Sequence, residues 1–306
     1  SSGGERLLAL RLRGREFPAR RLDARFAAAP RRLLLACRRL RLLVRGAGGF
    51  ELAFGVNHLG PYLLTRLLLP RLRAAGTARI VNVASQAHLR ARGHTVHCPT
   101  LAGNRPTDDR RTTGLEDAAQ SLANYLDQHE LNAVRLVGHS YGGMVISRVA
   151  DLRPNRIGRL VYVNAFVPQP GECLNDLVPP HYTALFDQVA AQSGGAVMLP
   201  FPIWREAFIN DADLALATSA FEHLNPHPYK TFQDPITLSQ PMAACPLPKS
   251  YVNCRMDTAL PQSLGWQPRL SERLGLFRYI ECSGSHEVWF TDPDAIASAI
   301  EQAGRD

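Results

Sequence analysis

Residues 136–146 read LVGHSYGGMVI, and this stretch decides the fold. An apolar run over 134–137 leads into Gly138-His139-Ser140-Tyr141-Gly142, and apolar residues at helical spacing follow. In this G-x-S-x-G pattern the serine occupies a strained turn between a strand and a helix. We expect the glycines two residues before and two after Ser140 to leave room for the neighbouring backbone. The pattern predicts a serine hydroxyl lifted above a sheet, at a helix N-terminus.

The chain around this turn alternates between short apolar runs and amphipathic stretches, which is typical of a doubly wound, mostly parallel α/β sheet. The predicted helices include 115–131 and 293–304, the second with Thr291 or Asp292 as its N-cap. The predicted strands are TVHCPTL (95–101), AVRLVG (133–138), LVYVNAFVP (160–168), SYVNCRM (250–256) and LFRYIEC (276–282).

A serine nucleophile needs a base, and the base needs an acid that orients it. On a strand–G-x-S-x-G–helix unit, the chain order is serine, acid, histidine. Asp257 directly follows the strand SYVNCRM, and His286 follows LFRYIEC, 29 residues later, which fits one helix and one strand between them. We therefore predict Ser140, Asp257 and His286 as the catalytic residues.

Other acids and histidines are weaker candidates. Asp234 has no clear strand leading into it, and His139 belongs to the serine turn itself. His181, His223 and His227 lie in a proline-rich middle region, where we expect them in a pocket or at the surface.

Residues 93–306 resemble bacterial α/β-hydrolases of the esterase and hydroxynitrile-lyase-like group, through GHTVHCPTLAG, LVGHSYGGMVI, RLVYVNAFVPQPGE and SHEVWFTDPDA. The resemblance implies that Ser140, Asp257 and His286 act as a triad and that the Tyr141 backbone N–H stabilises the oxyanion. It also implies a cap at about 168–250, and no metal or organic cofactor. The aromatic residues of this insertion either shape an apolar pocket or hold the cap together: Tyr182, Phe186, Phe201, Trp204, Phe208, Phe221 and Tyr229.

The first part of the chain has a different composition. Residues 1–93 hold 19 arginines and four acidic residues, whereas the remaining 213 residues hold 16 basic and 23 acidic ones. The arginines alternate with leucines and form no nucleic-acid-binding motif, so we expect no nucleic-acid partner. The step in composition indicates two segments that meet near residue 90.

FGVNHLGPYLLTRLLLPRL (54–72) and RIVNVAS (79–85) resemble short-chain dehydrogenases of the retinol-dehydrogenase type. The resemblance matches Asn57 to the structural asparagine of that family's active site and Ser85 to its catalytic serine. No tyrosine of this chain has a lysine four residues later, although the family's chemistry requires that pair. The glycine-rich dinucleotide loop is also missing. We therefore predict an incomplete, Rossmann-like fragment over 1–92, joined to a hydrolase domain over 93–306.

Hydrolases of this group carry an HG-containing loop that donates a second N–H to the oxyanion, and no such loop precedes GHTVHCPT at the usual distance. Residues 45–49 (RGAGG) are similar in composition but distant in sequence. Alternatively, RIVNVAS forms the missing third strand and places Ser85 and Gln86 at the oxyanion loop, followed by one short helix. We favour this second arrangement because it keeps sequential strands adjacent.

These patterns together predict hydrolysis of a small or medium carboxylic ester. The alternatives are cyanohydrin cleavage by the same triad, which a pocket lysine would favour, an impaired chimera, and, least favoured, an NADP-dependent oxidoreductase. No apolar run approaches the roughly 20 residues of a membrane span, so we expect no membrane partner. Six dispersed cysteines predict a reducing, cytoplasmic compartment, and the oligomeric state is left open.

Overall fold

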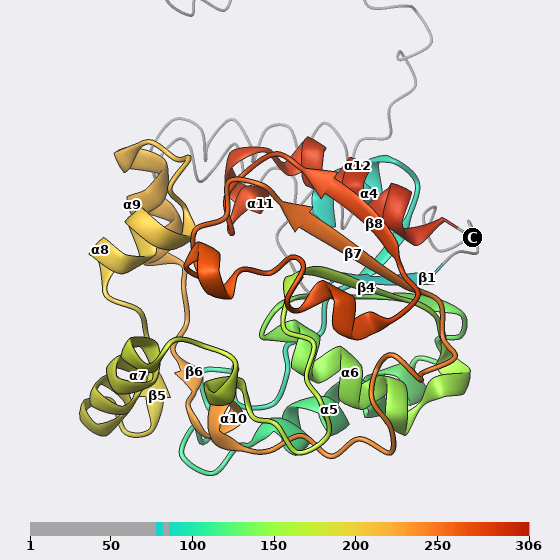
Figure 1. The fold of residues 1–306 in the computed structure, drawn as a ribbon, viewed down its shortest axis with the longest axis horizontal. Helices are drawn as coiled ribbons and strands as arrows, with labels where there is room; N and C mark the ends of the chain where they lie inside the picture. Colours follow the sequence, from blue (N-terminus) through green and yellow to red (C-terminus); the bar gives the residue numbers. More distant parts are fainter. Residues whose placement is uncertain (1–77, 82–85, 306) are drawn as a thin grey trace, which may run out of the picture. The chain divides into compact units, whose positions relative to one another are not determined.

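The protein is described by a computed structural model over residues 78–81 and 86–305 (Figure 1). A six-stranded sheet forms its centre, and every neighbouring pair of its strands is parallel. The strand order is β2 (Thr95–His97), β1 (Ala78–Val81), β3 (Val134–Ser140), β4 (Ile157–Ala165), β7 (Lys249–Cys254) and β8 (Arg278–Cys282). The predicted α/β fold with a parallel central sheet is confirmed.

Both faces of the sheet are covered, and β4 shows why. Its side chains alternate between two apolar clusters, with Leu160 and Tyr162 in one and Val161 and Val163 in the other. A strand buried on both faces needs a continuous apolar run. The first cluster includes side chains of α5 (Leu115–Gln128) and α6 (Gly142–Leu152); the second includes those of α4 (Gln86–Ala91), α11 (Val288–Thr291) and α12 (Pro293–Gly304).

Strand β1 lies between β2 and β3, where Ile80 is paired with His97 on one side and Leu136 on the other. This is the second of the two arrangements considered from the sequence, and the single short helix expected after it is α4. The remaining residues of the dehydrogenase-like stretch, including Asn57, Ser85 and residues 45–49, lie outside the described residues. A Rossmann-like fragment over 1–92 is therefore not established.

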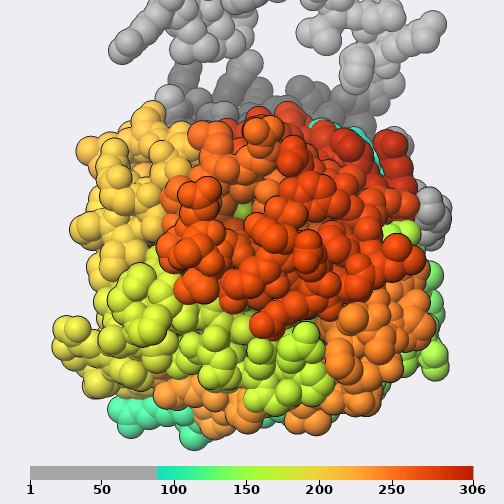
Figure 2. Space-filling model, viewed as in Figure 1, coloured from blue at the N-terminus to red at the C-terminus, as the bar shows by residue number. Residues whose placement is uncertain are grey.

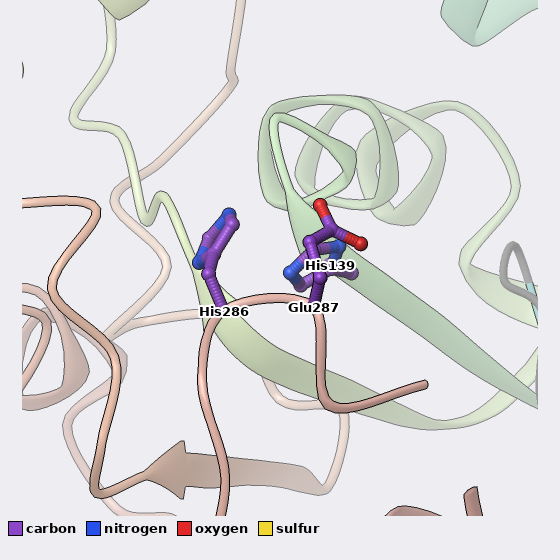
Figure 3. Close-up of side chains that lie close together, drawn as sticks. All are labelled: His139, His286 and Glu287. Carbon is purple, nitrogen blue, oxygen red and sulfur yellow. The ribbon is translucent and has the colours of Figure 1, made fainter. Parts of the chain in front are cut away.

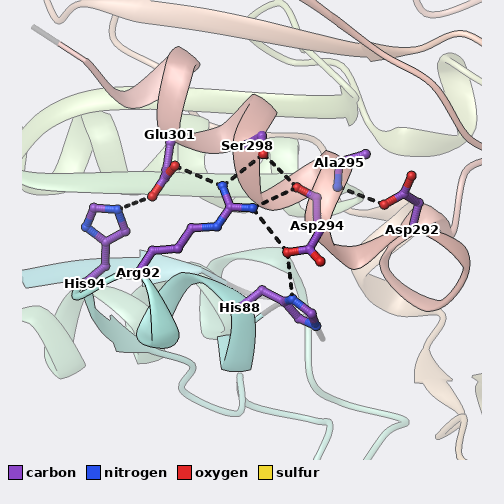
Figure 4. Close-up of polar contacts among 8 residues, drawn as sticks. All are labelled: His88, Arg92, His94, Asp292, Asp294, Ala295, Ser298 and Glu301. Carbon is purple, nitrogen blue, oxygen red and sulfur yellow. Dashed lines mark hydrogen bonds and ion pairs between the residues drawn. The ribbon is translucent and has the colours of Figure 1, made fainter. Parts of the chain in front are cut away.

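Helix α4 is fastened to α12 by a polar network (Figure 4). Arg92, just after α4, donates to the carboxylates of Asp294 and Glu301 at 3.2 and 3.0 Å. His88 contacts Asp294 at 3.0 Å, and His94 contacts Glu301 at 2.6 Å. Helix α12 thereby fixes the position of α4, the helix that follows β1.

Asp292 is the N-cap of α12, as one of the two sequence candidates: its carboxylate accepts from the Ala295 N–H at 2.9 Å. This bond satisfies one of the backbone donors that a helix N-terminus leaves free.

The segment between β4 and β7 forms a separate layer of short elements beside the sheet (Figure 1). In the space-filling view its yellow residues lie next to the orange and red residues that follow β7 (Figure 2). The elements of this layer are η5 (Leu174–Asp176), α7 (Pro180–Gln192), β5 (Ala196–Val197), α8 (Phe201–Ile203), the π-helical turn η6 (Trp204–Phe208), α9 (Leu214–Glu222), β6 (His227–Pro228) and α10 (Lys230–Gln233). Strands β5 and β6 pair antiparallel.

Three further 3₁₀ turns complete the described elements: η4 (Pro154–Arg156), η7 (Gln262–Leu264) and η8 (Ser271–Leu274). Within residues 78–81 and 86–305, no helix is both long and apolar enough to cross a membrane.

Candidate active site

Ser140 is the last residue of β3, and its backbone is strained. Its φ is +52°, a left-handed conformation that costs energy for any residue with a side chain. Helix α6 begins two residues later, at Gly142. The strand–turn–helix predicted from G-x-S-x-G is present, and it places Ser140 at the carboxyl edge of the sheet, beside a helix N-terminus.

Of the two glycines expected to leave room for the neighbouring backbone, Gly138 has that role and Gly142 does not. A Cβ on Gly138 would lie 2.6 Å from the Gly142 carbonyl oxygen, so this glycine is required. A Cβ on Gly142 would meet no atom within 4 Å, whereas one on Gly143 would lie 2.1 Å from the Phe166 carbonyl oxygen. The expectation for Gly142 is therefore wrong: the close approach of the backbone just after β4 falls on Gly143, the next residue of the chain.

Asp257 and His286 come together from the ends of two neighbouring strands. Asp257 Oδ2 lies 2.6 Å from His286 Nδ1, and both side chains are buried. The same oxygen accepts from the Asn164 side-chain amide, and Asp257 Oδ1 accepts from the Ala259 N–H at 2.8 Å. The carboxylate is thus fixed by three donors and holds the imidazole in one orientation.

The surroundings of His286 favour its protonated form. Burial lowers the pKa of its imidazole, but the charge and hydrogen bond of Asp257, together with the charge of Glu287, outweigh burial and leave the pKa raised. The ring of Trp266 stacks on His286 with centroids 5.2 Å apart, and Phe208 meets its edge at the same distance. The His286 imidazole therefore lies between two aromatic rings.

Ser140 and His286 line one cavity of about 250 Å³, together with the Tyr141 side chain. Most of the other lining side chains are apolar, and they come from the insertion and from the loop after β7. Ser140, Tyr141 and His286 thus border the same cavity, and Asp257 lies directly behind the histidine.

The aromatic residues of the insertion fall into two groups. Tyr182, Phe186, Trp204 and Phe208 line the cavity. Phe201 and Phe221 instead pack on each other at 5.2 Å. Tyr229 is also outside the lining, and its hydroxyl donates to Asp187 at 2.7 Å. The two functions that the sequence left open are therefore divided among different side chains.

Three of the rival candidates lie away from the cavity. Asp234 forms an ion pair with Lys230 and accepts from the Leu115 N–H at the start of α5. His181 and His223 are exposed. His227 does line the cavity, where it contacts the Thr231 hydroxyl at 2.8 Å, and burial lowers its pKa to about 4.

Among the described residues, Glu287 is the only carboxylic one that lines this cavity. Burial raises its pKa to about 7, while the charge of His286 opposes that shift. Figure 3 shows Glu287 beside the ring of His139, with His286 facing them both. The nitrogen and oxygen atoms with which these three residues could bind a metal ion lie within 4.8 Å of one another. In the described part of the chain, this is the one such group found.

Three residues of the site were not found from the sequence. Asn164 anchors Asp257, Glu287 adds a carboxyl group to the cavity, and Asp211 accepts from the Ser285 N–H and the Thr291 hydroxyl at 2.9 Å, which fixes the His286 loop. Asn164 had a visible signal, because it is a polar residue inside the buried run LVYVNAFVP. The partners of the other two depend on long-range packing.

Comparison with known families agrees with this fold. The alpha/beta hydrolase family model matches residues 42–299. This chain belongs to the alpha/beta hydrolase family. The match begins well before β1, which is consistent with the place of that strand inside the family's sheet.

Individual relatives of this hydrolase carry esterase and hydrolase names. The chain is 43% identical over 108 residues to the carbendazim hydrolyzing esterase of Nocardioides sp. (strain SG-4G), and the match covers 35% of this chain and 43% of that protein. The chain thus spans less than half the length of that relative. It is 27% identical over 225 residues to the pyrethroid hydrolase of Sphingobium wenxiniae, covering 69% of this chain and 78% of that protein.

Among solved structures, an extracellular alpha/beta-hydrolase from a Paenibacillus species aligns with a TM-score of 0.71 and 33% identity. The alignment covers 75% of this hydrolase and 99% of that chain. That protein is described as sharing structural and functional homology with tobacco salicylic acid binding protein 2.

The dehydrogenase resemblance is also found, over a short segment. Human retinol dehydrogenase 11 is 45% identical over 92 residues, which is 30% of this chain and 26% of that protein. A match of this extent shows local similarity and does not establish a fused dehydrogenase domain.

Proposed function

We propose that this hydrolase cleaves small or medium carboxylic esters, with Ser140 as nucleophile, His286 as general base and Asp257 as the residue that orients the base. The observation that carries the proposal is the 2.6 Å contact between Asp257 and His286 behind the cavity that Ser140 lines. The positive φ of Ser140 at the strand–helix turn is the second support.

In the proposed reaction, His286 takes the proton of the Ser140 hydroxyl through Nε2, because Nδ1 is held by Asp257. The serine oxygen then attacks the ester carbonyl, and the imidazolium gives its proton to the departing alkoxide. Water repeats the sequence on the acyl-enzyme and releases the acid. The raised pKa of His286 supports this function, since it reflects stabilisation of the charged form that appears in both steps.

The oxyanion of the tetrahedral intermediate would be bound by the Tyr141 backbone N–H, at the start of α6. The positive end of the helix dipole adds to this stabilisation. We propose that the second donor comes from Ser85 or Gln86, which follow β1. The support is the pairing of β1 beside β3, which brings the carboxyl end of β1 to the edge of the sheet where Ser140 lies.

The cavity supports an apolar substrate of modest size. Its lining is largely aromatic and aliphatic, and its volume of about 250 Å³ is at the small end for ligand pockets. Two of the relatives are named as a carbendazim hydrolyzing esterase and as a pyrethroid hydrolase. We therefore propose uncharged esters with an aryl or short alkyl group as the substrate class.

Cyanohydrin cleavage is the less favoured reaction. It would be supported by a lysine in the cavity, and the chain has only Lys230 and Lys249. Lys230 pairs with Asp234, and the Lys249 ammonium donates to the carbonyls of Met242 and Cys245 at 3.0 and 2.6 Å. Neither lysine lines the cavity, so hydrolysis remains the proposal.

A fluorophosphonate probe tests the proposal, because it reacts covalently with activated serines. We expect the full chain to be labelled and Ser140→Ala to lose labelling completely. Ser219→Ala removes an exposed serine of α9 and should label like the unaltered chain. Hydrolysis of aryl acetates and butyrates would then be measured for the labelled form.

The alternative of a catalytically impaired chain makes the opposite prediction. Folded, unaltered protein that stays unlabelled, or that labels equally well after Ser140→Ala, contradicts an activated Ser140. Labelling without turnover of any ester would place the defect in the oxyanion site, since loss of one donor reduces kcat by on the order of 10²–10³-fold.

A further inference from the structure

Two cysteines lie side by side at the ends of the two strands that precede Asp257 and His286. Cys254 ends β7, Cys282 ends β8, and the two are directly paired across these parallel strands. Both belong to the same apolar cluster, so their side chains point to the same face of the sheet. Both are free thiols and both are buried.

Their separation suits a disulfide. Neighbouring strands lie about 4.8 Å apart, and the Cα atoms of bridged cysteines are usually about 4.4–6.8 Å apart. The described part of the chain contains three other cysteines, Cys98, Cys173 and Cys245, and none of them lies in β7 or β8.

The two thiols also differ in acidity. A hydrogen bond between them raises the pKa of Cys254 and lowers the pKa of Cys282, which makes Cys282 the better thiolate. The thiolate is the form that attacks peroxides and disulfides. A thiolate with a second thiol beside it is the arrangement in which oxidation ends in a disulfide.

The backbone continues this pairing into the catalytic loops. Beyond the strand ends, the Arg255 N–H donates to the Cys282 carbonyl at 2.9 Å, and the Met256 N–H donates to the Gly284 carbonyl at 3.0 Å. Asp257 is the next residue after Met256, and His286 lies two residues after Gly284. A change at the cysteine pair is therefore transmitted to both members of the acid–base pair.

We propose that Cys254 and Cys282 are a redox modification site: hydrogen peroxide converts the pair to a disulfide, and the disulfide switches the hydrolase off. The Cys282 thiolate attacks one peroxide oxygen, gives a sulfenic acid and releases hydroxide, which takes a proton to become water. The Cys254 sulfur then attacks the sulfenic sulfur, the S–S bond forms, and a second water leaves. Two electrons pass from the sulfurs to the peroxide, and a dithiol reductant reverses the change.

The loss of activity follows from distances. A disulfide holds its Cβ atoms about 3.8 Å apart and its C–S–S–C dihedral at about 90°, a constraint that the reduced pair does not have, so forming the bond shifts the two strand ends from their positions in the reduced protein. Misplacement of catalytic groups by about 1 Å can cost on the order of 10²-fold in rate. This effect on activity depends on the proposed function, whereas formation of the disulfide does not.

The test treats the full chain with hydrogen peroxide, blocks remaining thiols, and maps the peptides by mass spectrometry. We expect a peptide pair joined through Cys254 and Cys282 that lacks two hydrogen atoms. Ester hydrolysis should fall by roughly tenfold to 10²-fold and return with dithiothreitol. Cys282→Ser and Cys254→Ala should each abolish the joined pair and keep their activity under peroxide, while Cys173→Ser should respond like the unaltered chain.

The proposal requires that the activity of both single variants becomes insensitive to peroxide. Two variants are used because one of them could misfold, and circular dichroism identifies a variant that has lost its fold. Peroxide treatment that joins other cysteines, or that yields only sulfinic acid at Cys282, overturns the site. A joined pair with unchanged hydrolysis overturns the switch. If the reduced protein shows no esterase activity, the proposed function fails, and the peptide map still decides whether the disulfide forms.

Discussion

Asn164 ties the acid of the site to the sheet from inside a buried strand. Its amide donates to Asp257, while its oxygen accepts from the Cys254 N–H at 2.8 Å. Its φ of +35° is a conformation that asparagine tolerates better than most residues. A single side chain thereby joins β4, β7 and the carboxylate that orients His286.

Replacing Asn164 by alanine should weaken both the fold and the site. The buried Cys254 N–H would lose its acceptor, which costs about 1–3 kcal/mol. Asp257 would lose one of its three donors, and we expect fluorophosphonate labelling to slow by roughly tenfold or more. Urea unfolding and labelling kinetics measure the two effects. Asn124→Ala, at an exposed position of α5, is the control, and equal behaviour of the two variants would contradict this function of Asn164.

Glu287 should make stability depend on pH in a direction opposite to most carboxylates. Its pKa in the folded protein is raised to about 7 from a usual 4.5. Between these values the folded state binds more protons than the unfolded one, so its contribution to stability falls as the pH rises. Glu287→Gln removes this loss. The variant should gain stability relative to the unaltered chain from about pH 4 to about pH 8, measured by urea unfolding.

The matched control for Glu287→Gln is Glu222→Gln, an exposed residue at the end of α9, which should leave the pH dependence unchanged. A constant difference between Glu287→Gln and the unaltered chain across the pH range would show that the pKa of Glu287 is the same in the folded and unfolded states, which contradicts the raised pKa.

At the scale of elements, the contact between the start of α6 and the end of β4 limits what the serine turn can accept. A Cβ at Gly143 would overlap the Phe166 carbonyl, and a Cβ at Gly142 would face open space. Gly143→Ala should therefore destabilise the protein by about 1–3 kcal/mol. Gly142→Ala should be neutral, or stabilising by up to about 1 kcal/mol through helix propensity. Thermal unfolding of the two variants compares them directly, and the reverse order would refute the assignment.

The network between α4 and α12 is a second feature at this scale, and it should be lost in acid. Burial raises the pKa of Glu301, but its bonds to His94 and Arg92 outweigh burial and leave the pKa lowered from 4.5. Its contribution to stability is therefore present above about pH 4.5 and lost as the pH falls through the lowered value.

Arg92→Met should accordingly reduce stability at neutral pH, and the difference from the unaltered chain should shrink below about pH 4. Because Ser85 and Gln86, proposed to hold the second oxyanion donor, lie just before α4 and at its first residue, labelling of Ser140 should also slow. Arg105→Met, an exposed residue outside this network, is the control. Unchanged labelling in Arg92→Met would separate the network from the oxyanion site.

For the whole molecule, the place of β1 decides where the chain can be shortened. Deleting residues 1–92 removes β1 and leaves β2 and β3 without the strand that pairs with both. That variant should be insoluble or fail to label. Deleting residues 1–41, which precede the family match, should keep labelling. Equal labelling of both shortened chains would show that the site does not depend on β1.

Much of the fold and of the site could be predicted from the sequence, because the strongest signals are local patterns. The serine turn, the alternation of strands and helices, and the positions of Asp257 and His286 after consecutive strands follow from short patterns and one rule of chain order. The crowding at Gly143, the carboxyl group of Glu287 in the cavity and the bonds of Asp211 could not be derived. Each of these depends on which distant segment packs there, and no local pattern carries that information.

Strand β1 bears on how genes for such proteins can change. The stretch that supplies it resembles another enzyme family, yet it occupies an interior position of this sheet. A segment that pairs between two parallel strands needs little more than backbone hydrogen bonds and a few β-branched side chains. Many unrelated proteins contain such segments. A segment as small as one strand with its adjoining loops would therefore suffice to fill this position, and its loop would bring new residues to the end of the strand where Ser140 lies.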